Sequence, residues 1–208
     1  MDIIPELKHY VEQNILPRYG VLDSGHSINH IQKVIDDSLT LAQQFDVDVN
    51  MVYVIAAYHD IGIEKSRELH HIISGEILIS DENLKKWFSQ QQIEIMRQAV
   101  EDHRASNKYE PRSIYGKIVA EADRDISLHT ILRRTVQFGL KNNPNNDFEL
   151  QFERAYHHLV NKYGENGYLK LYLNSAKNEK GLAEVRSAIS DKEILRNICK
   201  NIYDEETL

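Results

Sequence analysis

The chain has 208 residues, of which 41% are hydrophobic and 27% are charged, with 9 glycines and 4 prolines. This composition is that of a folded globular protein and excludes disordered and fibrous chains, and the length fits one domain with a hydrophobic core. The net charge of −7 leaves no broad basic surface for a phosphate backbone, so we expect no duplex nucleic acid as a partner.

The sequence indicates neither a membrane span nor an oxidising compartment. No run approaches the roughly 20 apolar residues that a membrane span needs, and the first residues, MDIIPELKHY, mix charged with apolar side chains. Cys199 is the only cysteine, which excludes an intrachain disulfide framework. We therefore expect a cytoplasmic protein without a membrane partner, and the sequence leaves the oligomeric state open.

Hydrophobic residues recur at helical spacing along almost the whole chain, while strand-like alternation is missing over any useful length. The first predicted helix ends by Pro17 and Gly20. The next helix has its apolar face from Ile31 to Phe45 and takes Ser27 as its N-cap. The pattern predicts an all-α fold.

The segment DVNMVYVIAAYHDIG continues this helical pattern. Val52, Ile55, Ala56 and His59 share one face of the predicted helix, and Gly62 ends it. We therefore expect the His59 side chain to point into the interior.

Three further helices are predicted at 66–80, 90–103 and 112–125. A Ser89–Gln92 capping box opens the second of them, and Pro111 precedes the third. Beyond residue 126 more helices follow, with breaks at 143–146, at 164–167 and near Gly181, and no low-complexity linker. The chain is therefore expected to form a single domain over residues 1–208.

Four successive helices each place a histidine or an aspartate on the inward face: His59, one of His70 and His71, His103, and Asp123. Any one of these histidines alone is more often a core or surface histidine than a ligand. A buried carboxylate without a partner, however, costs several kcal/mol or more, so an inward Asp123 needs hydrogen bonds or a cation. Together the four positions supply a mixed nitrogen and oxygen donor set, which predicts a metal site.

The ligand pattern resembles the HD superfamily of metal-dependent phosphohydrolases, which has a His, then an adjacent His-Asp pair, then a distant Asp. His30 in HSINHIQKV resembles the first ligand, His59 and Asp60 in AAYHDIG the pair, and Asp123 in IVAEADR the last ligand. The resemblance covers about residues 20–130 and implies an HD-domain helical bundle around the metal site, extended by C-terminal helices over about 131–208. The chain lacks the GYP sequence of cyclic dinucleotide hydrolases and the synthetase module of bifunctional alarmone enzymes.

Part of this superfamily holds a second metal through two more histidines, which His70 or His71 and His103 resemble here. Asp60 would then bridge two ions. The helical wheel places His70 closer than His71 to the apolar face, and the family spacing to a small residue four and five positions on also favours His70, although the choice stays open. The donor set of His30, His59, Asp60, His70, His103 and Asp123 suits one or two divalent ions of Fe, Mn, Co, Ni or Zn better than Mg.

The resemblance implies hydrolysis of a small phosphate ester, most plausibly a nucleotide, by a phosphomonoesterase or phosphodiesterase that uses a metal-activated hydroxide. Asp60, His26 and Arg124 are the residues to which we assign catalytic roles. His26 lies one helical turn before His30, so it would contact the substrate, or else it is a surface histidine. Arg124 is the best candidate among nearby cations for holding phosphate oxygens, or else it pairs with Asp125 or Glu121.

Two alternatives share these ligands. One is a diiron oxygenase of the same superfamily, which uses four histidines and two aspartates. The other is a regulatory HD protein that binds a nucleotide without turnover. The sequence identifies neither the substrate nor the native metal, and the ligands alone do not separate a hydrolase from an oxygenase.

Overall fold

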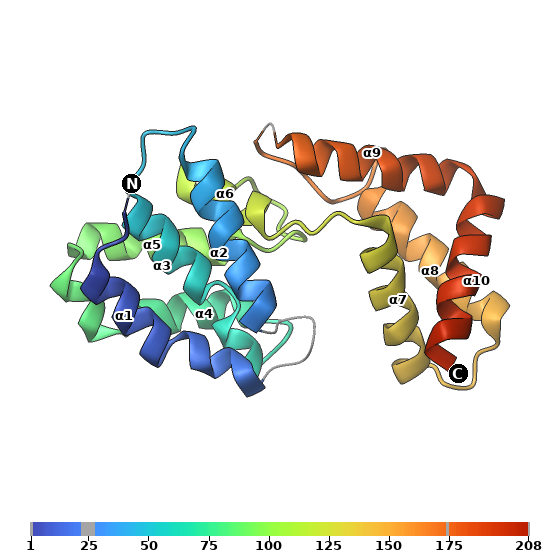
Figure 1. The fold of residues 1–208 in the computed structure, drawn as a ribbon, viewed down its shortest axis with the longest axis horizontal. Helices are drawn as coiled ribbons and strands as arrows, with labels where there is room; N and C mark the ends of the chain where they lie inside the picture. The colour runs from blue at the N-terminus through green and yellow to red at the C-terminus, as the bar shows by residue number, and fades with distance from the viewer. Residues whose placement is uncertain (1, 22–27, 174, 208) are drawn as a thin grey trace. The chain divides into compact units, whose positions relative to one another are not determined.

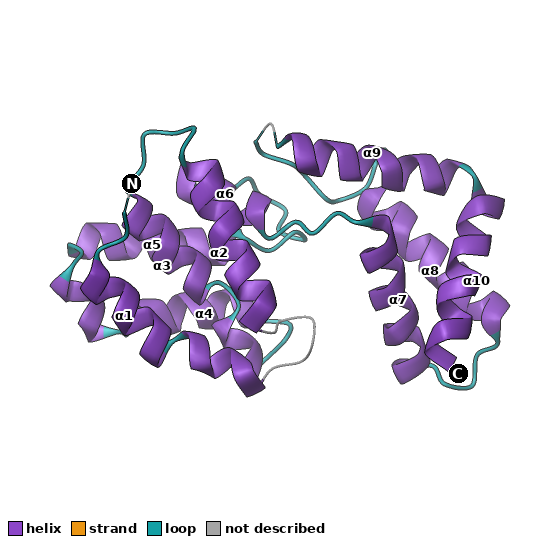
Figure 2. Cartoon of the chain, viewed as in Figure 1, coloured by secondary structure: helices purple, strands orange, loops and turns teal. Residues whose placement is uncertain are grey.

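The computed structural model describes residues 2–21, 28–173 and 175–207 (Figure 1). Throughout these described ranges every regular element is a helix, which confirms the predicted all-α class (Figure 2). Contacts between residues divide the chain into two compact units, Met1–Asp123 and Arg124–Leu208. The prediction of one domain with a core of about 20–130 stays a prediction. The predicted N-cap Ser27 lies outside the described residues.

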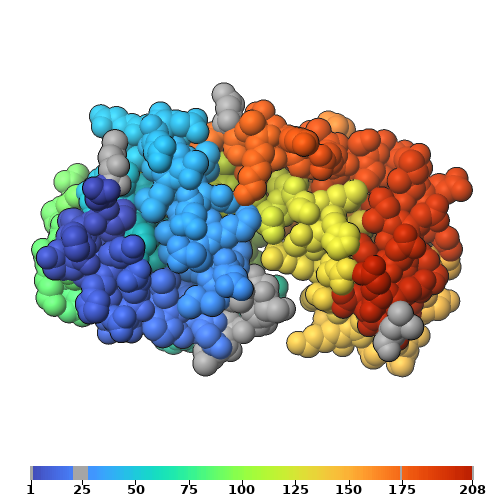
Figure 3. Space-filling view, in the orientation of Figure 1, coloured from blue at the N-terminus to red at the C-terminus, as the bar shows by residue number. Residues whose placement is uncertain are grey.

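The first unit is built around one central helix. Its α-helices are α1 (Pro5–Asn14), α2 (Ile28–Ala42), α3 (Val49–Tyr58), α4 (His70–Ile79), α5 (Gln90–Asp102) and α6 (Ile114–Ala122), and its short 3-10 helices are η1 (Leu16–Val21), η3 (Ile61–Glu64) and η4 (Glu82–Lys86). Helices α2, α5 and α6 pack against α3, and α4 packs against η3 and α5. On one face of the unit, α1, η1 and α2 lie side by side (blue in Figure 3).

Helix α3 is buried along its whole length rather than on one face. Asp48 caps its N-terminus by accepting a hydrogen bond from the Asn50 backbone N–H, and every residue from Met51 to Tyr58 is buried. A helix that is apolar on all sides belongs in the middle of a core. The residues that follow Tyr58 therefore begin their turn inside the protein.

The neighbouring helices begin close to the predicted places. The capping box between Ser89 and Gln92 is present at the start of α5, which confirms that prediction. Helix α6 begins at Ile114, after the N-cap Ser113, and α4 begins at His70, four residues later than predicted. The late start of α4 places His70 in its first turn.

The second unit consists of α7 (Leu128–Asn142), α8 (Phe148–Tyr163), α9 (Ala176–Ser190) and α10 (Lys192–Thr207). The predicted breaks at 143–146 and 164–167 are confirmed, but the break near Gly181 is wrong because Gly181 lies inside α9. A Cβ at this position would lie 2.1 Å from the backbone oxygen of Ile126. The glycine therefore permits a close approach of two backbones instead of ending the helix.

Across the described parts of the chain, no helix is both long enough and apolar enough to span a membrane.

Candidate metal centre

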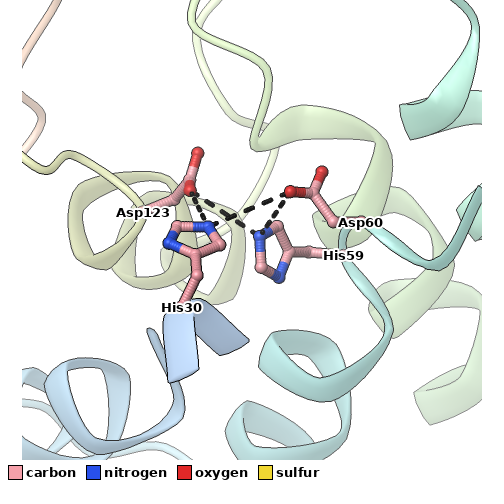
Figure 4. A group of neighbouring side chains, drawn as sticks. All are labelled: His30, His59, Asp60 and Asp123. Atoms are coloured by element: carbon pink, nitrogen blue, oxygen red, sulfur yellow. Dashed lines mark ion pairs between the residues drawn. The ribbon is translucent and has the colours of Figure 1, made fainter. Parts of the chain in front are cut away.

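Two groups of side chains that match metal-ligand geometry meet in the first unit. The first group is His30, His59, Asp60 and Asp123 (Figure 4). His30 Nε2 lies 3.3 Å from Asp123 Oδ1 and 4.0 Å from Asp60 Oδ2, and His59 Nε2 lies 3.6 Å and 3.4 Å from the same two oxygens. Two nitrogens and two oxygens therefore surround one point, as a mixed donor site for a divalent ion requires.

The second group shares Asp60 with the first. The other carboxylate oxygen, Asp60 Oδ1, lies 3.4 Å from His70 Nε2 and 3.3 Å from His103 Nε2, and the two histidine nitrogens are 3.2 Å apart. The Asp60 carboxylate thus has one oxygen in each group. This is the arrangement that a carboxylate bridging two ions needs.

The helices present these side chains from their ends. His59, His103 and Asp123 are the C-cap residues of α3, α5 and α6. His70 is the first residue of α4 and His30 lies in the first turn of α2. Because the C-terminus of a helix carries partial negative charge and the N-terminus partial positive charge, the ends of α3, α5 and α6 favour a cation at this place, while the starts of α2 and α4 oppose it in part.

Backbone hydrogen bonds orient three of the four histidine rings. In His59 and His70, Nδ1 lies 2.8 Å from the carbonyl oxygens of Ala56 and Arg67, and in His103 it lies 2.5 Å from that of Val100. An N–H at Nδ1 that donates to a carbonyl leaves Nε2 with a free lone pair, which is the usual preparation of a metal-ligating histidine. All three Nε2 atoms face Asp60.

The electrostatics of the two groups follow from burial and proximity. Burial opposes ionisation of Asp60, yet His59 and His103 hold its pKa well below the usual range. Burial likewise opposes protonation of His59, but Asp60 and Asp123 hold its pKa well above the usual range. Burial and the neighbouring His103 lower the pKa of His70 to about 4, so that imidazole is neutral at pH 7.

These residues fit a metal ion. His59 is fully buried, and its Nε2 has no hydrogen-bond partner although it faces two carboxylates. The raised pKa of His59 favours a second ring proton on Nε2, between the two carboxylates. When that proton is absent and Nδ1 holds the ring proton, Nε2 and the carboxylate oxygens are all electron-pair donors that repel one another. A cation between them satisfies every donor, and divalent ions with imidazole and carboxylate ligands do this.

The structure brings together six of the predicted site residues, and two other described ones, His71 and Arg124, lie outside the two groups. His71 is buried but belongs to neither group, and its Nδ1 has no hydrogen-bond partner. His26 lies outside the described residues. Arg124, which directly follows Asp123 in the chain, is buried.

The other nearby cations contact protein groups. Arg104, next to His103, donates a 2.7 Å hydrogen bond to the carbonyl oxygen of Glu68. Lys117 forms an ion pair with Glu110 at 2.5 Å. Arg104 is therefore tied to the chain segment that leads into α4.

Sequence reasoning missed the residues that hold this framework. The Tyr19 hydroxyl donates a 2.9 Å hydrogen bond to the carbonyl oxygen of Ala57, two residues before His59. Arg112 forms hydrogen bonds to both carboxylate oxygens of Asp102, next to His103, and so ties the loop after α5 to the end of that helix. These contacts join residues that are separated in the sequence, so no local sequence pattern predicts them.

Comparison with known families agrees with this geometry. Residues 27–127 match the family model of the HD domain. Searches among curated proteins and among solved structures found no significant match. The matched segment contains both groups of side chains, so residues 27–127 of this chain are an HD domain.

Proposed function

We propose that the protein is a metal-dependent phosphohydrolase that acts on a nucleotide or another small phosphate ester. The single observation that carries the proposal is the Asp60 carboxylate, which has one oxygen beside His30 and His59 and the other beside His70 and His103. The match of residues 27–127 to the HD domain supports hydrolase chemistry of this type. We also infer a cytoplasmic location, as expected for a chain with one cysteine.

Each side chain has a defined part in this function. A bound divalent ion lowers the pKa of a coordinated water toward about 7 and attracts phosphoryl oxygens. His59 and Asp60, held at the end of α3, fix the position of the ion, and the partly exposed Asp123, with 22% of its side chain accessible, lies toward solvent. In the proposal, Arg124 holds the substrate phosphate, and His26, four residues before His30 in the sequence, contacts the substrate.

The test is phosphate release from a panel of nucleotides and sugar phosphates with Mn²⁺, Co²⁺, Fe²⁺, Zn²⁺ or Mg²⁺. Asp60→Asn should reduce release by more than the roughly 10–100-fold that loss of a residue outside the ligand shell costs, because the side chain loses its negative charge and one of the two oxygens that face the ion positions. Asp46→Asn, which changes an exposed aspartate, is the matched control and should leave release unchanged.

If the wild type binds metal but releases no phosphate from any substrate of the panel, the hydrolase proposal is overturned. Oxygen uptake by the Fe²⁺ form would then support the oxygenase, and nucleotide binding without turnover would support the regulatory protein. Release that is equal in Asp60→Asn and the wild type would remove Asp60 from the reaction.

A further inference from the structure

The turn after His59 and Asp60 is joined to helix α4 by a buried hydrogen bond. The backbone N–H of Gly62 donates to Ser74 Oγ at 2.9 Å. Gly62 is buried and Ser74 has no exposed surface, so water cannot replace either partner. A buried N–H that loses its acceptor is costly, which makes this contact a strong constraint on how α4 sits against the turn.

The same contact includes a close approach of two backbones. A Cβ on Gly62 would lie 2.4 Å from the carbonyl oxygen of His70 and 2.8 Å from the backbone nitrogen of Ser74. Real side chains do not tolerate these separations, so the turn can approach α4 this closely only at a glycine. The carbonyl involved belongs to His70 itself.

The side of α4 at Gly75 is also closely packed. A Cβ on Gly75 would lie 3.1 Å from Glu101 Cγ and 3.2 Å from Arg97 Cγ, both on α5. Helix α5 ends at Asp102, and His103 is its C-cap. The adjacent small residues Ser74 and Gly75 therefore seat α4 between the turn that contains Asp60 and the helix that presents His103.

The packing of Ser74 and Gly75 determines the position of His70. The N-cap of α4, Leu69, makes no side-chain capping hydrogen bond, and His70 is the first residue of the helix. With α4 packed in this way, His70 Nε2 lies 3.4 Å from Asp60 Oδ1 and 3.2 Å from His103 Nε2. The first group draws on α2, α6 and the end of α3, but none of its ligands lies on α4.

We propose that Ser74 is a positioning residue that sets the affinity of the second ion position, formed by Asp60, His70 and His103, without setting that of the first. Gly62 is its partner, because it supplies the N–H and leaves room for α4. The inference rests on the two ion positions of the proposed function, but it does not depend on which reaction they support.

The test is a titration of the metal-free full chain with Co²⁺, followed by visible absorption and by metal content after gel filtration. In Ser74→Ala we expect the second equivalent to bind about 10–100-fold more weakly, as when a group that orients a ligand is removed, with the first equivalent unchanged. Gly62→Ala should show the same selective loss, because its Cβ displaces His70 and the start of α4.

Ser38→Ala is the matched control, since Ser38 is a fully buried serine on α2 whose Oγ has no hydrogen-bond partner. It should bind both equivalents as the wild type does. Equal weakening of both equivalents in Ser74→Ala and Gly62→Ala, unchanged binding in both, or a wild type that binds one equivalent would overturn the inference. Two bound equivalents without phosphate release in the wild type would contradict the proposed function and leave this inference standing.

Discussion

In the first unit, ionisable side chains come together in the interior. In the second unit, cations of α10 and carboxylates of α8 instead meet at the surface between these two helices. His59, Asp60 and His103 each have 4% or less of their surface exposed. In the second unit, cations on α10 lie over aromatic rings and beside carboxylates of α8: Lys192 over Tyr156 at 4.6 Å, Arg196 over Phe148 at 5.1 Å, and Lys192 beside Glu153 at 2.7 Å.

The two arrangements follow different physical rules. Removing a charge from water costs several kcal/mol, so the buried Asp60 carboxylate after α3 stays ionised only with an opposite charge close to it. Charges at the surface keep most of their hydration, and each such contact contributes little. A burial pattern of the first kind therefore indicates a ligand site, and one of the second kind indicates helix pairing.

Metal removal should have the largest effect and should separate the two units. Chelation should abolish phosphate release and destabilise the first unit, by about 2.7 kcal/mol for an ion present at 100 times its dissociation constant. Hydrogen exchange of the full chain measures this, and amides of residues 28–123 should exchange faster while those of 128–207 do not change. Equal acceleration in both units would show that the metal stabilises the whole chain rather than its first unit.

Asp81→Asn should have the next largest effect, within the first unit but away from the ligands. The Tyr10 and Tyr58 hydroxyls each donate a 2.5 Å hydrogen bond to Asp81 Oδ2. Weakening these charge-assisted bonds should lower the free energy of unfolding by about 2 kcal/mol at pH 7, measured by urea denaturation. Asp46→Asn is again the surface control, and an equal loss in both variants would contradict the assignment.

The effect of Asp81 also predicts a pH dependence. Burial raises the pKa of Asp81, but the hydrogen bonds from Tyr10 and Tyr58 outweigh it, so the pKa is lowered in the folded state. Its stabilisation is therefore complete above the unfolded pKa of about 3.9 and is lost as the pH falls through the lower folded value. The difference in stability between wild type and Asp81→Asn should shrink as the pH is lowered below about 4, and a constant difference would contradict this prediction.

Lys192→Met should have the smallest effect and should be confined to the second unit. Lys192 lies over the rings of Tyr156 and Phe152 and forms an ion pair with Glu153. We expect a loss of about 0.5–1 kcal/mol in the free energy of unfolding, which decreases with added salt because exposed charges are screened. Lys180→Met changes a lysine whose side chain is 81% exposed and serves as the control. A loss that is independent of salt would contradict the electrostatic origin.

Much of the fold could be read from local patterns, since helix periodicity and capping act over a few residues. The capping box at Ser89 and the breaks beyond Asn142 and Tyr163 are where the sequence places them. Gly181 was misread as a break because a glycine in a helix and a glycine at a helix end look alike in sequence. The close approach to Ile126, which explains the residue, is a tertiary contact.

The sequence by itself determined the helical class. It also nominated the residues of the candidate site, because four successive helices each place a His or Asp on the inward face and the order of these residues resembles the HD pattern. Only the tertiary structure decided that the two oxygens of Asp60 face different groups and that His70 rather than His71 joins the second. The hydrogen bond between Gly62 and Ser74 is likewise visible only in the tertiary structure. These features depend on how α3, α4 and α5 pack, and a difference of one residue along α4 rotates a side chain by about 100°, which the pattern of one helix cannot resolve.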